Sequence, residues 1–203
     1  MNQFDKLSAA RLRAEIANVS IGREIVVLEE TTSTNDVVRQ MAAGDWPEGL
    51  VVFAERQTAG RGQHGNRWES ATYQGLWFSI LLKPQLDIKD SARLTDWAAK
   101  TVAATIENHC LLPASIKHPN DVYIADRKVA GVLVEMCARP QAPHFSIIGI
   151  GLNVNQSRTD FPEELQNCAT SLAIVRGNQL DRHQLAVELL LNLDRTYLDL
   201  RGR

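Results

Sequence analysis

The 203-residue sequence has few cysteines and no excess of charge of either sign, and each shortage argues against a class of protein. Its three cysteines, Cys110, Cys137 and Cys168, are widely spaced and form no CxxC pair. This spacing disfavours a disulfide framework or a zinc site and predicts small buried or half-buried thiols in a reducing compartment. Lys and Arg number 22 against 24 Asp and Glu, so the clustered basic excess typical of nucleic-acid-binding proteins is missing.

Long apolar runs are missing as well. No stretch approaches the ~18 consecutive apolar residues that indicate a membrane span. The N-terminus, MNQFDKLSAARLRAEI, carries acids and lacks the apolar centre of a secretory signal. The absences predict a soluble, cytoplasmic protein without nucleic-acid or membrane partners. The hydrophobic content of 44% is enough for a real core, and we expect one domain over residues 1–203.

Hydrophobic spacing predicts a mixture of helices and strands. Strands are expected at 23–29, 50–55, 76–82, 115–117, 122–124, 129–137 and 145–152. Helices are expected after Ser8, around 37–41, from Asp90 or Ser91 to Asn108, and after Asp181. The cluster of hairpin-like strands in the middle favours an α+β fold, with one mixed, largely antiparallel sheet backed by helices.

The segment from Gln57 to Trp68, QTAGRGQHGNRW, is the most unusual stretch. Three glycines within six residues allow positive φ angles and a close approach of backbone to ligand. Successive N–H groups in such a loop can bind a phosphate or carboxylate, Arg61 and Arg67 add positive charge, and Trp68 adds a flat apolar wall. The loop matches neither a Walker A motif nor a dinucleotide-binding fingerprint, and taken alone it could equally be a flexible surface loop.

Three further segments combine charge or glycine with strand patterns. Lys117–Asp121 encloses a His-Pro-Asn turn that proline stiffens, although an ordinary solvated turn is the simpler local interpretation. Lys128 and Gly131 begin an apolar strand, which taken alone is equally natural as a turn followed by a strand. Gly149 and Gly151 alternate with apolar residues, so one face of that strand lacks side chains and could make room for a ligand lying flat on the sheet.

Six segments follow one another along about three quarters of the chain: TSTN at 32–35, QTAGRGQHGNRW at 57–68, KHPND at 117–121, RKVAGVLVE at 127–135, GIGLNVN at 149–155 and ATSL at 169–172. In this order they resemble the biotin–protein ligase family, which includes the holocarboxylase synthetases. The resemblance implies a fold related to lipoate ligases and class II aminoacyl-tRNA synthetases.

The resemblance also implies a reaction and its residues. Biotin would react with ATP, with Mg²⁺ present, to give biotinyl-5'-AMP, and would pass to a lysine of the biotin carboxyl-carrier domain of a carboxylase. Catalysis would involve Lys117, Asp121 and Arg61, while no metal ligand can be named. Biotin would contact Ser33, Thr34, Asn35, Gln57, Gly60, Arg61, Gly62, Gln63, Trp68, Lys128, Gly131 and Gly149. ATP would contact Arg61, Gln63, Asn66, Arg67, Trp68, Lys117, Asn120 and Asn153.

The sequence departs from the family pattern in several places. His118 stands where the family usually has Trp, and Gln63, His64 and Asn66 replace arginines of the ligases that double as repressors. We expect no N-terminal helix-turn-helix domain and no C-terminal SH3-like domain. Two alternatives stay open: a lipoate or octanoyl ligase of the same superfamily, and a biotin-binding homologue that is non-catalytic or performs only adenylation. Family members often pair through the sheet, so a homodimer is a further hypothesis.

Overall fold

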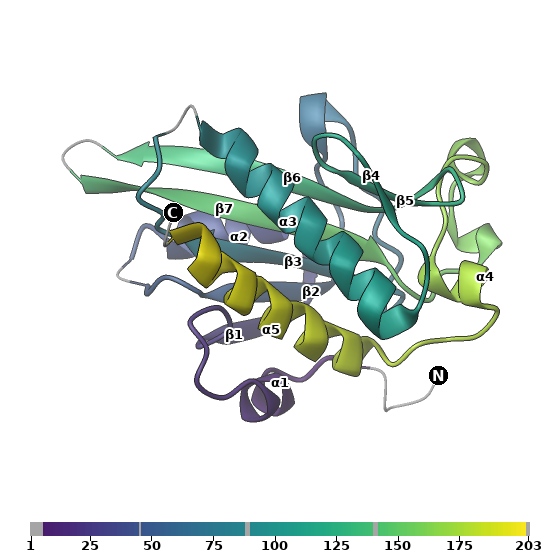
Figure 1. The fold of residues 1–203 in the computed structure, drawn as a ribbon, viewed down its shortest axis with the longest axis horizontal. Helices are drawn as coiled ribbons and strands as arrows, with labels where there is room; N and C mark the ends of the chain where they lie inside the picture. Colours follow the sequence, from purple (N-terminus) through teal and green to yellow (C-terminus); the bar gives the residue numbers. More distant parts are fainter. Residues whose placement is uncertain (1–5, 45, 88–89, 140–141, 202–203) are drawn as a thin grey trace.

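The computed structural model describes residues 6–44, 46–87, 90–139 and 142–201. A seven-stranded sheet has the order β1-β2-β3-β7-β6-β5-β4 (Figure 1). Its strands are β1 (Ile25–Thr31), β2 (Val51–Gln57), β3 (Gly75–Leu82), β4 (Ser115–Lys117), β5 (Asp121–Ile124), β6 (Arg127–Arg139) and β7 (Ala142–Asn153). β1 and β2 run parallel, whereas the other neighbours are antiparallel, which confirms the expected largely antiparallel sheet.

Helices cover both faces of the sheet. α3 (Ser91–Thr105) and α5 (Arg182–Arg201) lie side by side across one face, with α1 (Ala9–Glu15) against α5 (Figure 1). α2 (Thr34–Met41) lies on the opposite face, and the short α4 (Leu172–Arg176) follows the last strand. Among the described residues, no helix combines the length and the apolar character needed to cross a membrane.

The two faces carry separate hydrophobic cores. The larger core lies under α3 and α5 and includes Val102 and Ile148, both fully buried. The smaller core lies under α2 and includes Val38 and Ile147. Because successive strand residues point to opposite faces, Ile147 and Ile148 of β7 enter different cores. This alternation places the odd-numbered residues of β7 on the α2 face, where the polar segments of the sequence also gather.

The register of the strands brings residues from several motif segments into a single row across the sheet. Lys117 of β4 pairs with Asp121 of β5, and Asp121 pairs with Gly131 of β6. Gly131 pairs with Gly151 of β7, which in turn pairs with Trp77 of β3. Residues far apart in the sequence therefore line up across the sheet, because each strand contributes one residue to the row.

A buried ion pair fastens α5 to the strand that leads into the glycine-bearing loop. Arg182, at the start of α5, places Nη1 2.8 Å and Nη2 2.5 Å from Oε2 of Glu55 on β2. The other oxygen of Glu55 accepts a hydrogen bond from the backbone N–H of Leu7 at 2.8 Å. Burial raises the pKa of Glu55, and the charge of Arg182 opposes that rise. Both side chains are buried, so the pair fixes the position of β2 relative to α5.

The helix starts follow the expected capping chemistry at two places. Ser8 Oγ accepts a hydrogen bond from the N–H of Arg11 at 3.4 Å, where α1 begins. Asp181 Oδ1 accepts one from the N–H of Gln184 at 3.0 Å, at the start of α5. Such caps satisfy N–H groups that have no partner inside the helix.

α3 and the cysteines differ in part from the expectation. α3 begins at Ser91 with no side-chain cap bond from Asp90, and it ends at Thr105 in a π-helical turn, Ile106–Cys110. Within the part of the chain that the structure describes, none of the three cysteines forms a disulfide, and Cys110 is buried and Cys137 half-buried as expected. Cys168 is exposed, contrary to the expectation, because residues 163–168 form a surface segment.

Candidate functional site

A pocket of about 440 Å³ including open solvent lies on the α2 face. It is bounded by the start of α2, the loop 57–68, and strands β6 and β7. Every residue that the sequence predicts around biotin lines this first pocket, except Gly60. Phe78, Val132, Leu133 and Ile150 also line it. Phe78 lies outside the six segments, and the other three are apolar residues within RKVAGVLVE and GIGLNVN that were not predicted to contact biotin.

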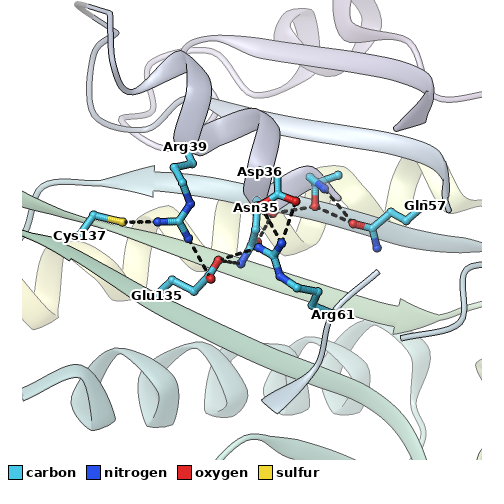
Figure 2. Close-up of polar contacts among 9 residues, drawn as sticks. Asn35, Asp36, Arg39, Gln57, Arg61, Glu135 and Cys137 are labelled. Atoms are coloured by element: carbon cyan, nitrogen blue, oxygen red, sulfur yellow. Dashed lines mark hydrogen bonds and ion pairs between the residues drawn. The ribbon is translucent and has the colours of Figure 1, made fainter. Parts of the chain in front are cut away.

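The floor of the first pocket is a chain of hydrogen bonds (Figure 2). Gln57 Oε1 accepts from the N–H of Thr34 at 2.9 Å, and the hydroxyls of Thr34 and Ser79 are 2.7 Å apart. Ser79 Oγ donates to Asn35 Oδ1 at 2.5 Å, and Asn35 Nδ2 donates to Glu135 Oε2 at 2.6 Å. Ser79 is fully buried within an apolar strand, and this isolated hydroxyl is the signal that sequence reasoning missed.

The glycine-bearing loop is folded onto itself. The N–H of Gly62 donates to the carbonyl of Asn66 at 2.7 Å, and the N–H of Trp68 donates to the carbonyl of Gly60 at 2.9 Å. Between them, Gln63–Gly65 form a 3₁₀ turn. A Cβ atom at Gly60 would lie 2.6 Å from the carbonyl oxygen of Trp68, so the close backbone approach requires glycine there. The loop therefore has a defined shape that brings Trp68 back over the sheet.

Trp68 lies in space left by two glycines of neighbouring strands. A Cβ atom would lie 2.9 Å from the indole at Gly131 and 2.4 Å from it at Gly151. At Gly149 the corresponding space holds Asn35, whose Oδ1 would be 2.4 Å from a Cβ atom. The sequence suggested that the glycines make room for a flat ligand. In this structure the room holds protein side chains that form the pocket wall, because the loop and α2 both fold onto that face.

A second pocket, of about 580 Å³ including open solvent, adjoins the first. Trp68 and Lys128 line both pockets, so they form the junction between them. The second pocket also contains the apolar side chains Phe161 and Leu165 and the thiol of Cys168. These three were missed by sequence reasoning, since their segment has no glycine or charge pattern, only an apolar pair ahead of the ATSL segment.

The residues expected around ATP divide between the pockets. Arg67 and Asn153 line the second pocket, as does Trp68. Arg61, Gln63 and Asn120 line the first pocket. Asn66 and Lys117 line neither.

Charged groups concentrate at the junction. Lys128 Nζ lies 2.7 Å from Asp121 Oδ1 and 5.3 Å from the centre of a Trp68 ring. Lys117 is exposed, and its Nζ lies 5.6 Å from the centre of the Tyr123 ring. Burial raises the pKa of Tyr123, and the nearby charge of Asp121 adds to the rise. Lys128 is therefore the cation that faces both pockets, with Asp121 beside it.

His118, the departure from the family pattern, lies outside both pockets. Its side chain is 67% exposed, and Nδ1 is 3.8 Å from Asp96 Oδ1 of α3. The departure from the family pattern therefore lies in an exposed turn, and His118 forms no part of either pocket wall.

Comparisons with known proteins agree with this geometry. Over 194 residues, the chain is 36% identical to the bifunctional ligase/repressor BirA of Bacillus subtilis, and the matched region covers 96% of this chain and 60% of that protein. Over 202 residues, it is 32% identical to the biotin–[acetyl-CoA-carboxylase] ligase of Mycobacterium tuberculosis, covering 97% of this chain and 73% of that protein. The chain thus spans about 60% of the length of the Bacillus relative.

A solved structure matches the fold. Biotin protein ligase from Aquifex aeolicus in complex with biotin and ATP superposes with a TM-score of 0.75 and 31% identity, covering 89% of this chain and 73% of that chain. This likeness confirms the fold that the resemblance implied. The model of the biotin/lipoate A/B protein ligase family matches residues 27–153, which include the glycine-bearing loop and the junction residues. The chain therefore belongs to the biotin/lipoate A/B protein ligase family.

Proposed function

We propose that this chain activates biotin with ATP to biotinyl-5'-AMP and transfers the biotinyl group to a lysine of a carrier protein. The observation that carries the proposal is the pair of adjoining pockets that share Trp68 and Lys128. A reaction that joins two substrates needs two subsites and a charged group where they meet. The Aquifex relative, solved with biotin and ATP together, supports this assignment.

The first pocket suits the ureido head of biotin. Ser33, Thr34 and Gln57 present hydroxyl and carboxamide groups, which can donate to the ureido oxygen and accept from its N–H groups. A pocket built from such groups rejects a ligand that leaves them without partners. Lipoate has no ureido group, so this floor favours biotin over lipoate.

The second pocket suits the nucleotide. Phe161 and Leu165 provide apolar surface for a base, and Arg67 and Asn153 provide polar groups at the rim. A biotin chain extending from the first pocket reaches the second at the junction, where its carboxylate meets the α-phosphate beside Lys128.

The chemistry then requires positioning and charge stabilisation. A carboxylate oxygen of biotin bonds to the α-phosphorus, and the bond to pyrophosphate breaks. Lys128 is placed to stabilise the negative charge at this centre. In the second step a carrier amine attacks the acyl carbonyl and AMP leaves. The amine must lose a proton, and Asp121 is the proposed acceptor or orienting group.

A Mg²⁺ ion forms part of the proposal. Among the described residues, no group of three or more His, Cys, Asp and Glu side chains could hold a metal ion. Nucleotide-bound Mg²⁺ needs only one or two protein carboxylates, since phosphates and waters supply the other oxygens. Asp121, with a side chain 22% exposed at the junction, fits this requirement. When bound, the ion would neutralise phosphate charge.

The partners are proposed on the same footing. The carrier would be the biotin carboxyl-carrier domain of a carboxylase, in keeping with the name of the Mycobacterium relative.

A homodimer would form through the sheet. β5 pairs with β6 only as far as Gly131, and within the described residues no strand covers the outer edge of β6 beyond it. An uncovered strand edge can pair with another chain.

The direct test is to incubate the protein with biotin, ATP and Mg²⁺, with and without a carrier domain. We expect pyrophosphate release and a gain of one biotin in the mass of the carrier. Pyrophosphate without carrier labelling would limit the function to adenylation. Binding of biotin without pyrophosphate would make the protein a non-catalytic homologue, and activation of lipoate alone would change the substrate.

A further inference from the structure

Asp36 and Glu135 line neither pocket and have no role in the proposed function, yet both hold Arg61 of the glycine-bearing loop (Figure 2). Arg61 Nη1 lies 2.7 Å from each carboxylate oxygen of Asp36, the third residue of α2. Arg61 Nη2 lies 3.3 Å from Glu135 Oε2 on β6. The loop is thus tied by one side chain to a helix and to a strand.

Glu135 is the centre of this cluster. Its Oε2 accepts from Asn35 Nδ2 at 2.6 Å as well as from Arg61, and its Oε1 lies 2.9 Å from Arg39 Nη2. Arg39 in turn donates to Cys137 Sγ at 3.1 Å. The Glu135 side chain is 25% exposed and Asn35 is 3% exposed, so part of the cluster is shielded from water.

The contacts are of the stronger kinds. Hydrogen bonds between ionised partners are shorter and stronger than neutral ones, and a guanidinium matches carboxylates in fixed geometry. The bond to Asp36 and the charge of Glu135 raise the pKa of Arg61, so the guanidinium stays charged at every working pH. An isolated exposed ion pair contributes little, but several charges that share one carboxylate form a network.

The same carboxylate reaches the floor of the first pocket. Asn35, held by Glu135, accepts from Ser79, and Ser79 contacts Thr34, which donates to Gln57. The loop and the proposed ureido subsite are therefore connected through Glu135. One oxygen of Glu135, Oε2, accepts both the bond from Arg61 and the bond from the Asn35 carboxamide.

We propose that Asp36 and Glu135 are positioning residues that clamp the glycine-bearing loop through Arg61, and that Glu135 couples loop closure to the ureido subsite. The second half rests on the proposed function. A closed loop excludes water from a hydrolysable acyl adenylate. Without the clamp, the loop opens more often and the adenylate is lost to water before the carrier amine attacks it.

The clamp is tested first without any substrate. Trypsin cleaves after Arg67 when the loop opens, and the rate follows the population of the open form. We expect Glu135→Gln and Asp36→Asn each to speed this cleavage about tenfold, and the double variant to speed it further. The matched control is Glu30→Gln, which removes the same charge but breaks the exposed Arg56–Glu30 pair at 2.9 Å between β1 and β2, outside the Arg61 cluster, and should leave the rate unchanged.

Urea midpoints of all variants separate local opening from loss of the whole fold. Unchanged cleavage in the double variant would overturn the clamp. Faster cleavage only in proportion to a lowered urea midpoint would overturn it too, because the effect would then be global.

The coupling is tested as the number of ATP molecules consumed for each carrier molecule labelled. We expect a ratio near one for the native chain and Glu30→Gln, and several-fold higher for Glu135→Gln, with the KM for biotin raised more than kcat is lowered. A ratio unchanged despite faster loop cleavage would overturn the coupling. If no variant, and not even the native chain, consumed ATP while cleavage still rose, the clamp would stand and the proposed function would fall.

Discussion

Lys128 owes its place at the junction to two local features of the backbone. A register shift between Val122 and Tyr123 lets β5 pair Tyr123 with Lys128 and Asp121 with Gly131. On the other side, the N–H of Lys128 donates to the carbonyl of Cys168 at 2.8 Å. This bond brings the segment of Cys168 against the start of β6, so that one lysine reaches both pockets.

At this scale we expect Lys128→Ala to lower pyrophosphate release by about 10²–10³-fold, as the loss of one preorganised charge-stabilising donor often does. Lys117→Ala should cost less, because its exposed ammonium lies over Tyr123 and lines neither pocket. Single-turnover measurements with saturating biotin compare the two. An inactive Lys117→Ala beside an active Lys128→Ala would reverse their roles.

The cysteines offer a second residue-scale prediction. Burial raises the pKa of Cys110 to about 11, so at pH 8 only about one molecule in a thousand carries the reactive thiolate. Cys168 is exposed and lines the second pocket. We expect iodoacetamide to modify Cys168 first, ATP to slow that reaction, and Cys110 to react only after unfolding, as followed by mass spectrometry. Equal rates with and without ATP would argue against a nucleotide in that pocket.

At the scale of elements, the glycines of β6 and β7 matter through what the loop places on them. Gly131 and Gly151 are register partners, and the indole of Trp68 lies over both. A strand with side chains at these positions would hold the same sheet but would keep the loop away from it. The two pockets therefore depend on a contact between a loop and two strands.

We expect Gly151→Ala to displace Trp68, since the new methyl group would lie 2.4 Å from the ring. Biotin affinity should fall at least tenfold, with little loss of sheet stability. Titration calorimetry measures the affinity, and indole fluorescence reports the ring. Gly44→Ala is the matched control, because its nearest contact would be 3.4 Å away and it lies outside both pockets.

A second element-scale prediction concerns the attachment of α5 to β2. Arg182→Ala leaves the buried carboxylate of Glu55 without its cation, and such losses cost about 3–5 kcal/mol of unfolding free energy. Urea unfolding measures this, with Arg56→Ala at an exposed pair as control. A change within 0.5 kcal/mol, on the order of an ordinary surface substitution, would show that the ion pair does not hold α5 in place.

At the scale of the whole molecule, the sheet separates a large core from a smaller one that shares its face with the pockets. A ligand in the first pocket touches α2, the glycine-bearing loop and strands β6 and β7 at once. Binding therefore adds contacts to several elements of the folded chain that the unfolded chain cannot offer together, and it should be visible as added stability of the fold.

Biotin at 100 times its Kd should raise the free energy of unfolding by about 2.7 kcal/mol. For a chain of this size that corresponds to a rise in Tm of roughly 5–10 °C. Lipoate at the same concentration should produce no shift, since it lacks the ureido group. A thermal scan with each ligand makes the comparison, and a larger shift with lipoate would favour the lipoate-ligase alternative.

Much of the fold could be predicted because its signals are local. The apolar run of β3, the caps at Ser8 and Asp181, and the turn residues between strands each depend on neighbours in the sequence. The end of α3 was less predictable. It continues into the π-helical turn Ile106–Cys110, whose first and last side chains, Ile106 and Cys110, are both buried in the core, and such packing leaves no local signal in the sequence.

The sequence by itself determined most of the elements, the largely antiparallel sheet and most of the lining of the first pocket, because periodicity, caps and motifs depend on residues that are close together in the sequence. Only the tertiary structure decided that Trp68 lies on two glycines and that Glu135 holds both Arg61 and Asn35. Those contacts join residues 74 and 100 positions apart, and no local pattern specifies which distant partner a charged side chain will meet. The polar segments of the sequence indicated where the pocket lies. The folding of the loop onto the sheet decided that Asp36 and Glu135 contact Arg61 of that loop.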